Sequence, residues 1–163
     1  MKRYKTGMYG GKFMPMHAGH MHCLRVASEM CDKVYLILFF GGNQEEEIIA
    51  RDDREFLHVS ARMAQTLKAA SMFDNVEPLF LDVTDCRYPD GTEDWDAETP
   101  IVLNACGKFD AVFGSEPDYA PYFERAYPWA DYVLVDSSRT EVPISGTQIR
   151  EMESLEEVNK WIV

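Results

Sequence analysis

The sequence contains no apolar run long enough to cross a membrane. Its longest, VYLILFF at 34–40, has the length of a buried strand. The amino-terminal segment begins with basic residues but lacks the apolar stretch of a signal peptide. These two absences argue against a membrane protein and against a secreted one. We therefore expect a cytoplasmic protein with no membrane partner.

Basic residues are also scarce. The chain has 16 Lys and Arg against 28 Asp and Glu, which gives a formal net charge of −12. Binding of nucleic acid depends on Lys and Arg that neutralise phosphates, so this balance argues against a nucleic-acid partner. An anionic substrate would need a local set of basic residues, against an unfavourable overall field. The acidic clusters at 44–47, 82–98 and 151–157 are interpreted as solvated faces and loops.

The four cysteines form no C-x-x-C pair. We predict that they are free thiols, mostly buried, as is usual in a cytoplasmic protein. A metal-binding module built from Cys23 and the histidines at 17, 20 and 22 is an alternative. Its spacing matches no structural zinc pattern, and we predict no dedicated metal site.

The 163 residues suit a single domain, 1–163, with a sizeable core. Apolar runs alternate with segments of helical period. Strands are predicted at 4–10, 33–40, 76–83, 110–115 and 131–137. Helices are predicted at 20–31, 52–71, 97–106, 120–127, 145–153 and 154–163. This alternation predicts an α/β fold of the Rossmann-like, doubly wound kind, with a parallel five-stranded sheet and helices on both faces.

Two local features refine this scheme. Asp52 is the expected N-cap of the helix at 52–71. The segment 84–96, TDCRYPDGTEDWD, has no element of its own. A loop of this length in a compact domain is more often functional or mobile than idle.

The stretch GGKFMPMHAGH, at 10–20, leaves the first strand and enters the first helix. It is neither a P-loop, because G-x-x-x-x-G-K-[ST] is absent, nor the dinucleotide fingerprint G-x-G-x-x-G. Glycines let backbone N–H groups approach phosphate oxygens, and a helix amino terminus attracts anions. His17 and His20 can donate hydrogen bonds to one phosphoryl group, and Lys12 adds a positive charge.

GKFMPMHAGH resembles the G-x-F-x-P-x-H-x-G-H signature of the nucleotidylyltransferase superfamily. ISGTQIR, at 144–150, resembles the second signature of that superfamily, I-S-[ST]-T-x-I-R. The resemblance spans about residues 4 to 152. Gly146 is the one departure from the signature. Ser or Thr is usual at this position in the family, so glycine removes one hydroxyl from the phosphate-binding segment.

The resemblance implies which residues carry the chemistry. The catalytic residues would be Lys12, His17, His20 and Arg150. The ATP-binding residues would be Gly10, Gly11, Phe13, Gly19, Gly114, Ser115, Ser145 and Thr147. In the family, the second signature binds the β- and γ-phosphates. This agrees with the residue types here, because Ser145 and Thr147 place hydroxyls at a helix start and Arg150 follows about one turn later.

The motif looks most like the adenylyltransferase domain of the bacterial bifunctional NMN adenylyltransferase/ribosylnicotinamide kinase. FGSEPDYAPYF (113–123) and VLVDSSRTEVPISGTQIR (133–150) are similar to the same domain. The resemblance implies transfer of AMP from ATP to nicotinamide mononucleotide (NMN), with Mg²⁺ accompanying ATP. The sequence contains no P-loop, so we expect the adenylyltransferase without the kinase half. Relatives form homo-oligomers of various sizes, and no feature of this sequence fixes the number.

For the acceptor, the resemblance implies that Trp95 stacks on the nicotinamide ring in a cation–π contact. Arg51, Arg54 and Arg62 are the candidate ligands of the NMN phosphate, and Arg62 is the one that we expect. The alternative acceptors are nicotinate mononucleotide, FMN or another phosphorylated metabolite, with adenylyl or cytidylyl transfer. A nucleotide-binding regulatory protein that has lost catalysis is an alternative of another class.

Overall fold

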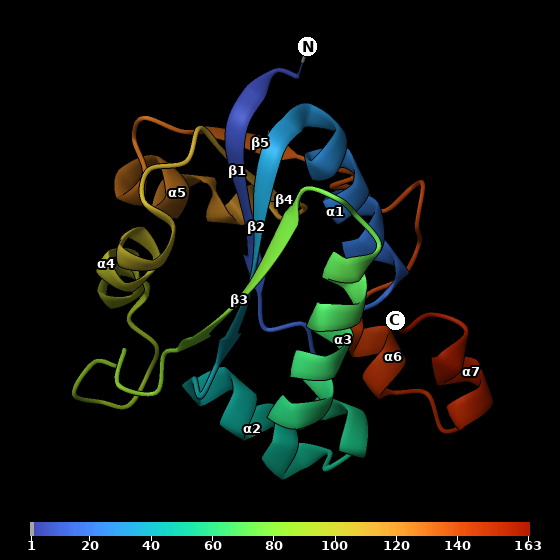
Figure 1. The fold of residues 1–163 in the computed structure, drawn as a ribbon. Helices are drawn as coiled ribbons and strands as arrows, with labels where there is room; N and C mark the ends of the chain where they lie inside the picture. Colours follow the sequence, from blue (N-terminus) through green and yellow to red (C-terminus); the bar gives the residue numbers. More distant parts are fainter. Residues whose placement is uncertain (1) are drawn as a thin grey trace.

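A computed structural model describes residues 2–163, in which five parallel strands form one sheet in the order β3-β2-β1-β4-β5 (Figure 1). The strands are β1 (Tyr4–Gly11), β2 (Cys31–Phe40), β3 (Val76–Asp82), β4 (Ala111–Gly114) and β5 (Asp131–Leu134). The predicted Rossmann-like α/β fold with a parallel five-stranded sheet is confirmed.

Helices cover both faces of the sheet, with α1 and α3 on one side and α4 and α5 on the other (Figure 1). The helices are α1 (Ala18–Met30), α2 (Asn43–Arg51), α3 (Val59–Ser71), α4 (Trp95–Cys106), α5 (Ala120–Ala126), α6 (Gly146–Arg150) and α7 (Leu155–Asn159). Two short 3₁₀ turns, η1 (Glu55–Leu57) and η2 (Pro117–Tyr119), precede α3 and α5. Within residues 2–163, no helix combines the length and the apolar character needed to cross a membrane.

Strand β2 contributes side chains to the hydrophobic cores on both faces of the sheet. Its even-numbered residues Val34, Leu36 and Leu38 pack in the core beneath α1 and α3. Ile37, together with Phe39, packs on the opposite face with Val102 of α4. Successive side chains of a strand point to opposite faces, so a strand buried on both sides is apolar throughout. This explains the continuous apolar run at 34–40.

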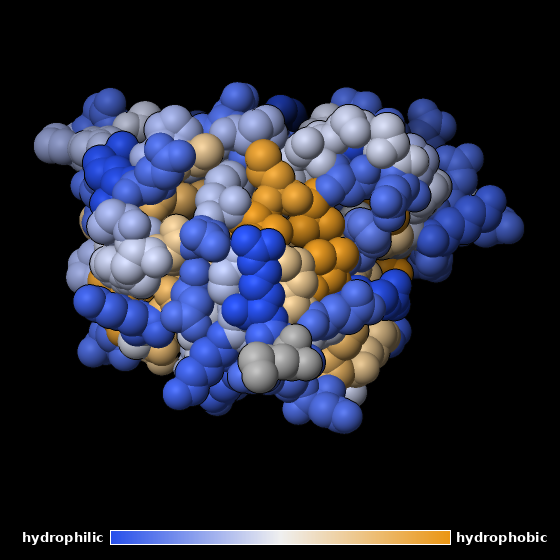
Figure 2. All heavy atoms as spheres, turned by 90° about the horizontal axis from the view of Figure 1, so that it is seen from above, coloured by the Kyte–Doolittle hydropathy of each residue, from blue (hydrophilic) through white to orange (hydrophobic). Residues whose placement is uncertain are grey.

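The strand order places a switch point between β1 and β4. The chain builds outward from β1 through β2 to β3 and then returns to add β4 on the other side of β1. Ligands of such sheets bind beyond the carboxyl ends of the strands at this point. The strands run downward in Figure 1, so this end lies below. Figure 2 views the opposite end, which is mainly hydrophilic with one apolar band.

The prediction of one helix over 52–71, capped by Asp52, is wrong. Asp52 is instead the C-cap of α2, and α3 begins only after His58. The acidic segment 44–47, expected as a solvated face or loop, is part of α2. Glu45 is buried there because it pairs with Arg62 and accepts the N–H of Gly41. The sequence pattern did not reveal this pairing, since the partners are far apart along the chain.

Two smaller shifts affect the site. Helix α1 begins at Ala18, two residues before the predicted start, with His17 as its N-cap. Helix α4 begins at Trp95, with Asp94 as its N-cap. The irregular segment predicted at 84–96 therefore ends at Asp94, and Trp95 lies on a helix rather than on a loop.

Candidate active site

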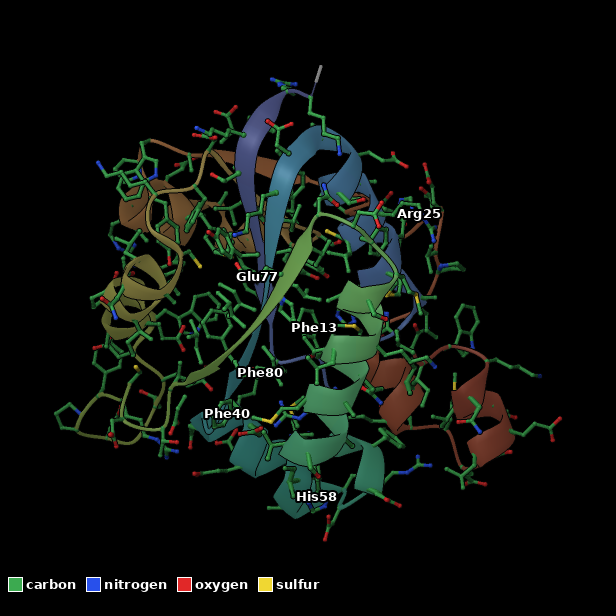
Figure 3. All side chains as sticks on the ribbon, viewed as in Figure 1. Phe13, Arg25, Phe40, His58, Glu77 and Phe80 are labelled. Carbon is green, nitrogen blue, oxygen red and sulfur yellow. The ribbon has the colours of Figure 1, made fainter. Side chains whose placement is uncertain are left out.

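A cavity of about 340 Å³ lies at the carboxyl ends of β1 and β4. This volume is in the usual range for ligand pockets. Gly10 and Gly11 of β1 line it on one side, and Gly114 and Ser115 line it on the other. Figure 3 labels Phe13, another lining residue, near this end of the sheet, whereas Arg25 of α1 lies toward the other end. The cavity thus occupies the switch point of the sheet.

The histidine pair forms one end of the cavity. The rings of His17 and His20 are stacked, with centroids 3.7 Å apart. Nδ1 of His17 accepts the N–H of Gly19 at 3.0 Å, and Nδ1 of His20 accepts the N–H of His17 at 3.0 Å. The two rings thereby complete a capping box at the start of α1. Since each Nδ1 accepts, the neutral rings carry their protons on Nε2, which is left to donate to a ligand.

Gly19 is the residue that makes room for this arrangement. A Cβ at position 19 would lie 2.9 Å from a carbon of the His17 ring. A side chain there would push the imidazole from its place. The glycine between the two histidines therefore has a packing reason that is independent of any ligand.

Burial keeps both imidazoles neutral. Burial, followed by the charges of Arg139 and Arg150, lowers the pKa of His17 to about 4. The pKa of His20 is held well below its ordinary value by burial, followed by His17 and Arg139. At neutral pH the pair therefore consists of uncharged hydrogen-bond donors rather than two cations.

Lys12 supplies a positive charge just beyond β1. Its ammonium group pairs with Glu93 and donates to Gln44 Oε1 at 2.9 Å. Burial raises the pKa of Glu93, but the hydrogen bond and charge of Lys12, with the N–H groups of Gln44 and Trp95, outweigh it and hold that pKa below its usual range. In this structure Lys12 is thus held by a carboxylate at the cavity wall.

Arg139 is an arginine at the cavity that was not among the predicted site residues. It lines the cavity, donates to Ile144 O at 2.8 Å and pairs with Glu116 at 3.2 Å. Asp136 fixes the turn that carries it, because its carboxylate accepts N–H groups of the next loop. These hydrogen bonds lower the pKa of Asp136 to about 2, and the one from the N–H of Val142 has the largest effect. The segment VDSSRT was the available signal, but no role was predicted for it.

Aromatic side chains form the other end of the cavity. Trp95 of α4 packs against Tyr119 of η2 and Tyr122 of α5, with ring centroids 5.0 Å and 5.4 Å apart. Tyr122 donates to Trp95 O at 2.8 Å, which ties α5 to the start of α4. Glu98 lines the cavity one turn after Trp95. Only Trp95 was predicted; the tyrosines and Glu98 come together through the packing of three elements.

The second motif lies outside the lining of this cavity. Ser145 is the N-cap of α6, and its Oγ accepts the N–H of Gln148 at 3.2 Å. Arg150 donates to Met14 O at 2.7 Å and to Thr147 Oγ1 at 3.2 Å. The motif therefore joins α6 to the chain segment between Lys12 and His17. A Cβ at Gly146 would lie 3.1 Å from the Arg150 guanidinium, so this packing suits glycine there.

Arg62 does not reach the cavity, so its predicted contact with the acceptor phosphate is not realised. Its side chain is 0% exposed and pairs with Glu45. It also donates to Leu57 O and Lys12 O, each at 2.8 Å. Its donors are used in holding α2, η1 and the Lys12 loop together. Arg62 is a structural residue beneath the site.

Metal-ligating side chains are not clustered in the part of the chain that the structure describes. No group of three or more His, Cys, Asp or Glu in residues 2–163 is arranged to hold a metal ion. All four cysteines are free thiols, and Cys106 is the one that is only partly buried.

The sequence is similar to known proteins. The family model described as cytidylyltransferase-like matches residues 8–152. The chain is 28% identical over 156 residues to the trifunctional NAD biosynthesis/regulator protein NadR of Escherichia coli K12, covering 89% of this chain and 36% of that protein. It is 23% identical over 148 residues to phosphopantetheine adenylyltransferase of Streptococcus pneumoniae, covering 91% of this chain and 83% of that enzyme.

A solved structure shares the fold. The NadR protein in complex with NAD and AMP-PNP superposes with a TM-score of 0.68 at 21% identity, over 99% of this chain and 45% of that one. The chain thus spans little more than a third of the first curated relative and less than half of this structure.

Proposed function

The chain belongs to the cytidylyltransferase-like family, within the nucleotidylyltransferase superfamily, and we propose that it transfers AMP from ATP to NMN, giving NAD and pyrophosphate. One observation carries the proposal: a single cavity joins a pair of imidazole donors to an aromatic cluster. The first suits phosphates, and the second suits a flat cationic ring. NMN combines a phosphate with such a ring.

The proposed reaction is a direct displacement. An oxygen of the NMN phosphate attacks the α-phosphorus of ATP in line and forms the new P–O bond. The bond from the α-phosphorus to the oxygen that bridges to the β-phosphorus breaks, and the electron pair leaves with pyrophosphate. The NMN phosphate is already ionised at neutral pH, so no general base is required. Catalysis then consists of positioning and of stabilising charge.

The residues of the imidazole end have distinct roles in this reaction. Nε2–H of His17 and of His20 donate to oxygens of the α- and β-phosphates, where charge develops. Lys12 exchanges its carboxylate partner Glu93 for a phosphate oxygen. Arg139, which lines the cavity, adds a second cation. The β- and γ-phosphates extend toward α6, where Ser145, Thr147 and Arg150 are the proposed ligands.

The other predicted ATP contacts stay part of the proposal. Gly114 and Ser115, at the end of β4, would lie beside the adenine and ribose, with backbone groups making the contacts. Mg²⁺ is proposed to enter with ATP, held by phosphate oxygens and water, which is its usual preference. When bound, the ion neutralises part of the phosphate charge.

One competing acceptor is a flexible phosphorylated chain such as phosphopantetheine, the substrate that the name of the Streptococcus pneumoniae relative implies for that enzyme. The cluster of Trp95, Tyr119 and Tyr122 favours a flat ring instead, because offset or edge contacts between rings add to the burial of area. Nicotinate mononucleotide and FMN also carry flat rings and are the nearer alternatives.

The test is a pyrophosphate-release assay with ATP and Mg²⁺, run with NMN, nicotinate mononucleotide, FMN and phosphopantetheine in parallel. We expect release with NMN. The variant His20→Ala removes one donor and should lower kcat by about 100-fold or more.

His22→Ala is the matched control, because His22 is on the same helix but pairs with Glu141 at 3.2 Å and does not line the cavity. It should keep wild-type activity. Release only with another acceptor would overturn the NMN assignment and keep the chemistry. No release with any acceptor would favour a nucleotide-binding protein without catalysis.

A further inference from the structure

Glu98 is a carboxyl group in the cavity for which the proposed reaction has no use. It lies in the first turn of α4, three positions after Trp95, and both side chains line the cavity. Residues at this spacing share one face of a helix. Among residues 2–163, no side chain or backbone N–H forms a hydrogen bond or an ion pair with it in the structure. By contrast, Asp96, two residues earlier, points outward and pairs with Arg125 at 3.0 Å.

The surroundings of Glu98 disfavour the ionised form of its carboxyl group. Burial, and then the charge of Glu93, raise the pKa of Glu98 to about 7, while Lys12 opposes them. Asp94 adds a further negative charge from the preceding loop. Burying a carboxylate without a partner is unfavourable. A bound ligand that donates a hydrogen bond to the carboxylate, or that carries positive charge, therefore stabilises it. The aromatic end of the cavity is thus acidic as well as apolar.

This combination distinguishes two rings that stack equally well. A pyridinium ring with a carboxamide brings a positive charge and N–H donors toward a carboxylate. The same ring with a carboxylate brings a like charge, which an ionised carboxyl group in the site repels. Trp95 cannot separate the two rings, since stacking acts on the face of the ring and not on its substituent.

We propose that Glu98 is the specificity-determining residue that selects an acceptor with a carboxamide-bearing cationic ring over the same ring bearing a carboxylate. The inference rests on the proposed function, since it concerns the acceptor of that reaction. It assigns the discrimination to one carboxyl group and to repulsion of the wrong substrate, which is a common way to obtain specificity.

The test compares Glu98→Gln with Asp96→Asn. Both variants replace a carboxylate by an amide in the first turn of α4, but only the first changes the cavity. The glutamine can still accept from a carboxamide, and it can donate to a carboxylate. At pH 8, where a carboxyl group of this pKa is mostly ionised, we expect the ratio of kcat/KM for NMN to that for nicotinate mononucleotide to fall about tenfold in Glu98→Gln. In Asp96→Asn the ratio should equal that of the wild type.

A second measurement separates selection from a general structural role. The ratio should fall in the wild type as the pH is lowered from 8 to 6, because a protonated Glu98 no longer repels a carboxylate and can donate to it. It should be flat with pH in Glu98→Gln. The pH dependence of Asp96→Asn should follow the wild type. The same ratios are measured as dissociation constants by calorimetry with each mononucleotide in the presence of a non-hydrolysable ATP analogue.

The outcomes distinguish this inference from the proposed function. Turnover of NMN by the wild type with an unchanged ratio in Glu98→Gln overturns the role of Glu98 and leaves the reaction standing. Binding that depends on Glu98, without turnover, overturns the reaction and supports the selection. A wild type that neither binds nor converts NMN overturns both.

Discussion

The two ends of the cavity are built in different ways. The histidine pair at the imidazole end comes from one stretch of eleven residues, 10–20, and hydrogen bonds within that stretch fix its geometry. The aromatic end is assembled from α4, η2 and α5, which only the packed fold brings together. Burial acts on both ends but with opposite effects on pKa, lowering it for His17 and raising it for Glu98. The histidine pair is thus encoded locally, whereas the proposed contacts to the acceptor are encoded non-locally.

The largest effect should follow from removing the donor of His17 while keeping its cap. In His17→Asn the amide oxygen can replace Nδ1 as acceptor for the start of α1, because asparagine is a good N-cap. The Nε2–H donor is lost. We expect kcat in the pyrophosphate assay to fall about 100-fold or more, with the melting temperature nearly unchanged.

His17→Ala is the companion variant, since it loses the cap and the donor together. It should show the same fall in kcat and an additional loss of about 1 kcal/mol in the free energy of unfolding. Equal activity of His17→Asn and the wild type would mean that His17 only caps the helix. The local end would then be structural, and the contrast between the two ends would disappear.

A smaller effect is expected at the aromatic end. Trp95→Ala should raise KM for the acceptor about tenfold, because a cation–π contact of about 1–2 kcal/mol is lost. KM for ATP should stay within about twofold, since the proposed contacts to ATP are made by other residues. Trp95→Phe should recover most of the loss.

Trp129→Phe serves as the control, because Trp129 is 40% exposed and does not line the cavity. Its kinetic constants should match those of the wild type. If Trp95→Ala changed kcat and both KM values together, Trp95 would be a packing residue, and the aromatic end would have no separate role.

The smallest effect concerns stability against pH, and here the two ends should differ in sign. The folded pKa of His17 is about 4, below the ordinary 6.5, so between these values only the unfolded chain binds the proton. His17 therefore lowers the free energy of unfolding as the pH falls from 6.5 to 4. The folded pKa of Glu98 is about 7, above the ordinary 4.5, so Glu98 stabilises the fold as the pH falls from 7 to 4.5.

Urea unfolding at pH 7, 6 and 5 measures these slopes. Relative to the wild type, His17→Asn should lose stability less steeply on acidification, and Glu98→Gln more steeply. Each difference should be at most about 1.4 kcal/mol per pH unit. Parallel curves for all three proteins would contradict the opposite titration of the two ends.

The sheet and the imidazole end of the cavity could be predicted from the sequence because each is encoded by a short, local pattern of residues. The apolar run of β2 and the motif from Gly10 to His20 need no distant partner to be recognised. Trp95 was predicted through the resemblance and lines the cavity, although on a helix.

The remaining residues depend on partners that the pattern does not show. Arg62 was assigned to a phosphate, but its charge is used by Glu45, which lies on another helix. Glu98, Tyr119 and Tyr122 reach the cavity only because α4 and α5 pack on the same face of the sheet. Arg139 does so through a turn whose backbone has φ values of 48° at Asp136 and 55° at Arg139.

The pair formed by Glu45 and Arg62 has a consequence for how this chain can change over generations. Removing one member of a buried ion pair leaves an uncompensated charge, at a cost of about 3–5 kcal/mol, whereas replacing both by apolar residues is often neutral. Much of a domain's stability would be lost in the single step. A mutation at one of the two positions is therefore easier to tolerate when the other position changes with it. In related sequences, residues 45 and 62 should therefore change together, even though neither lines the cavity.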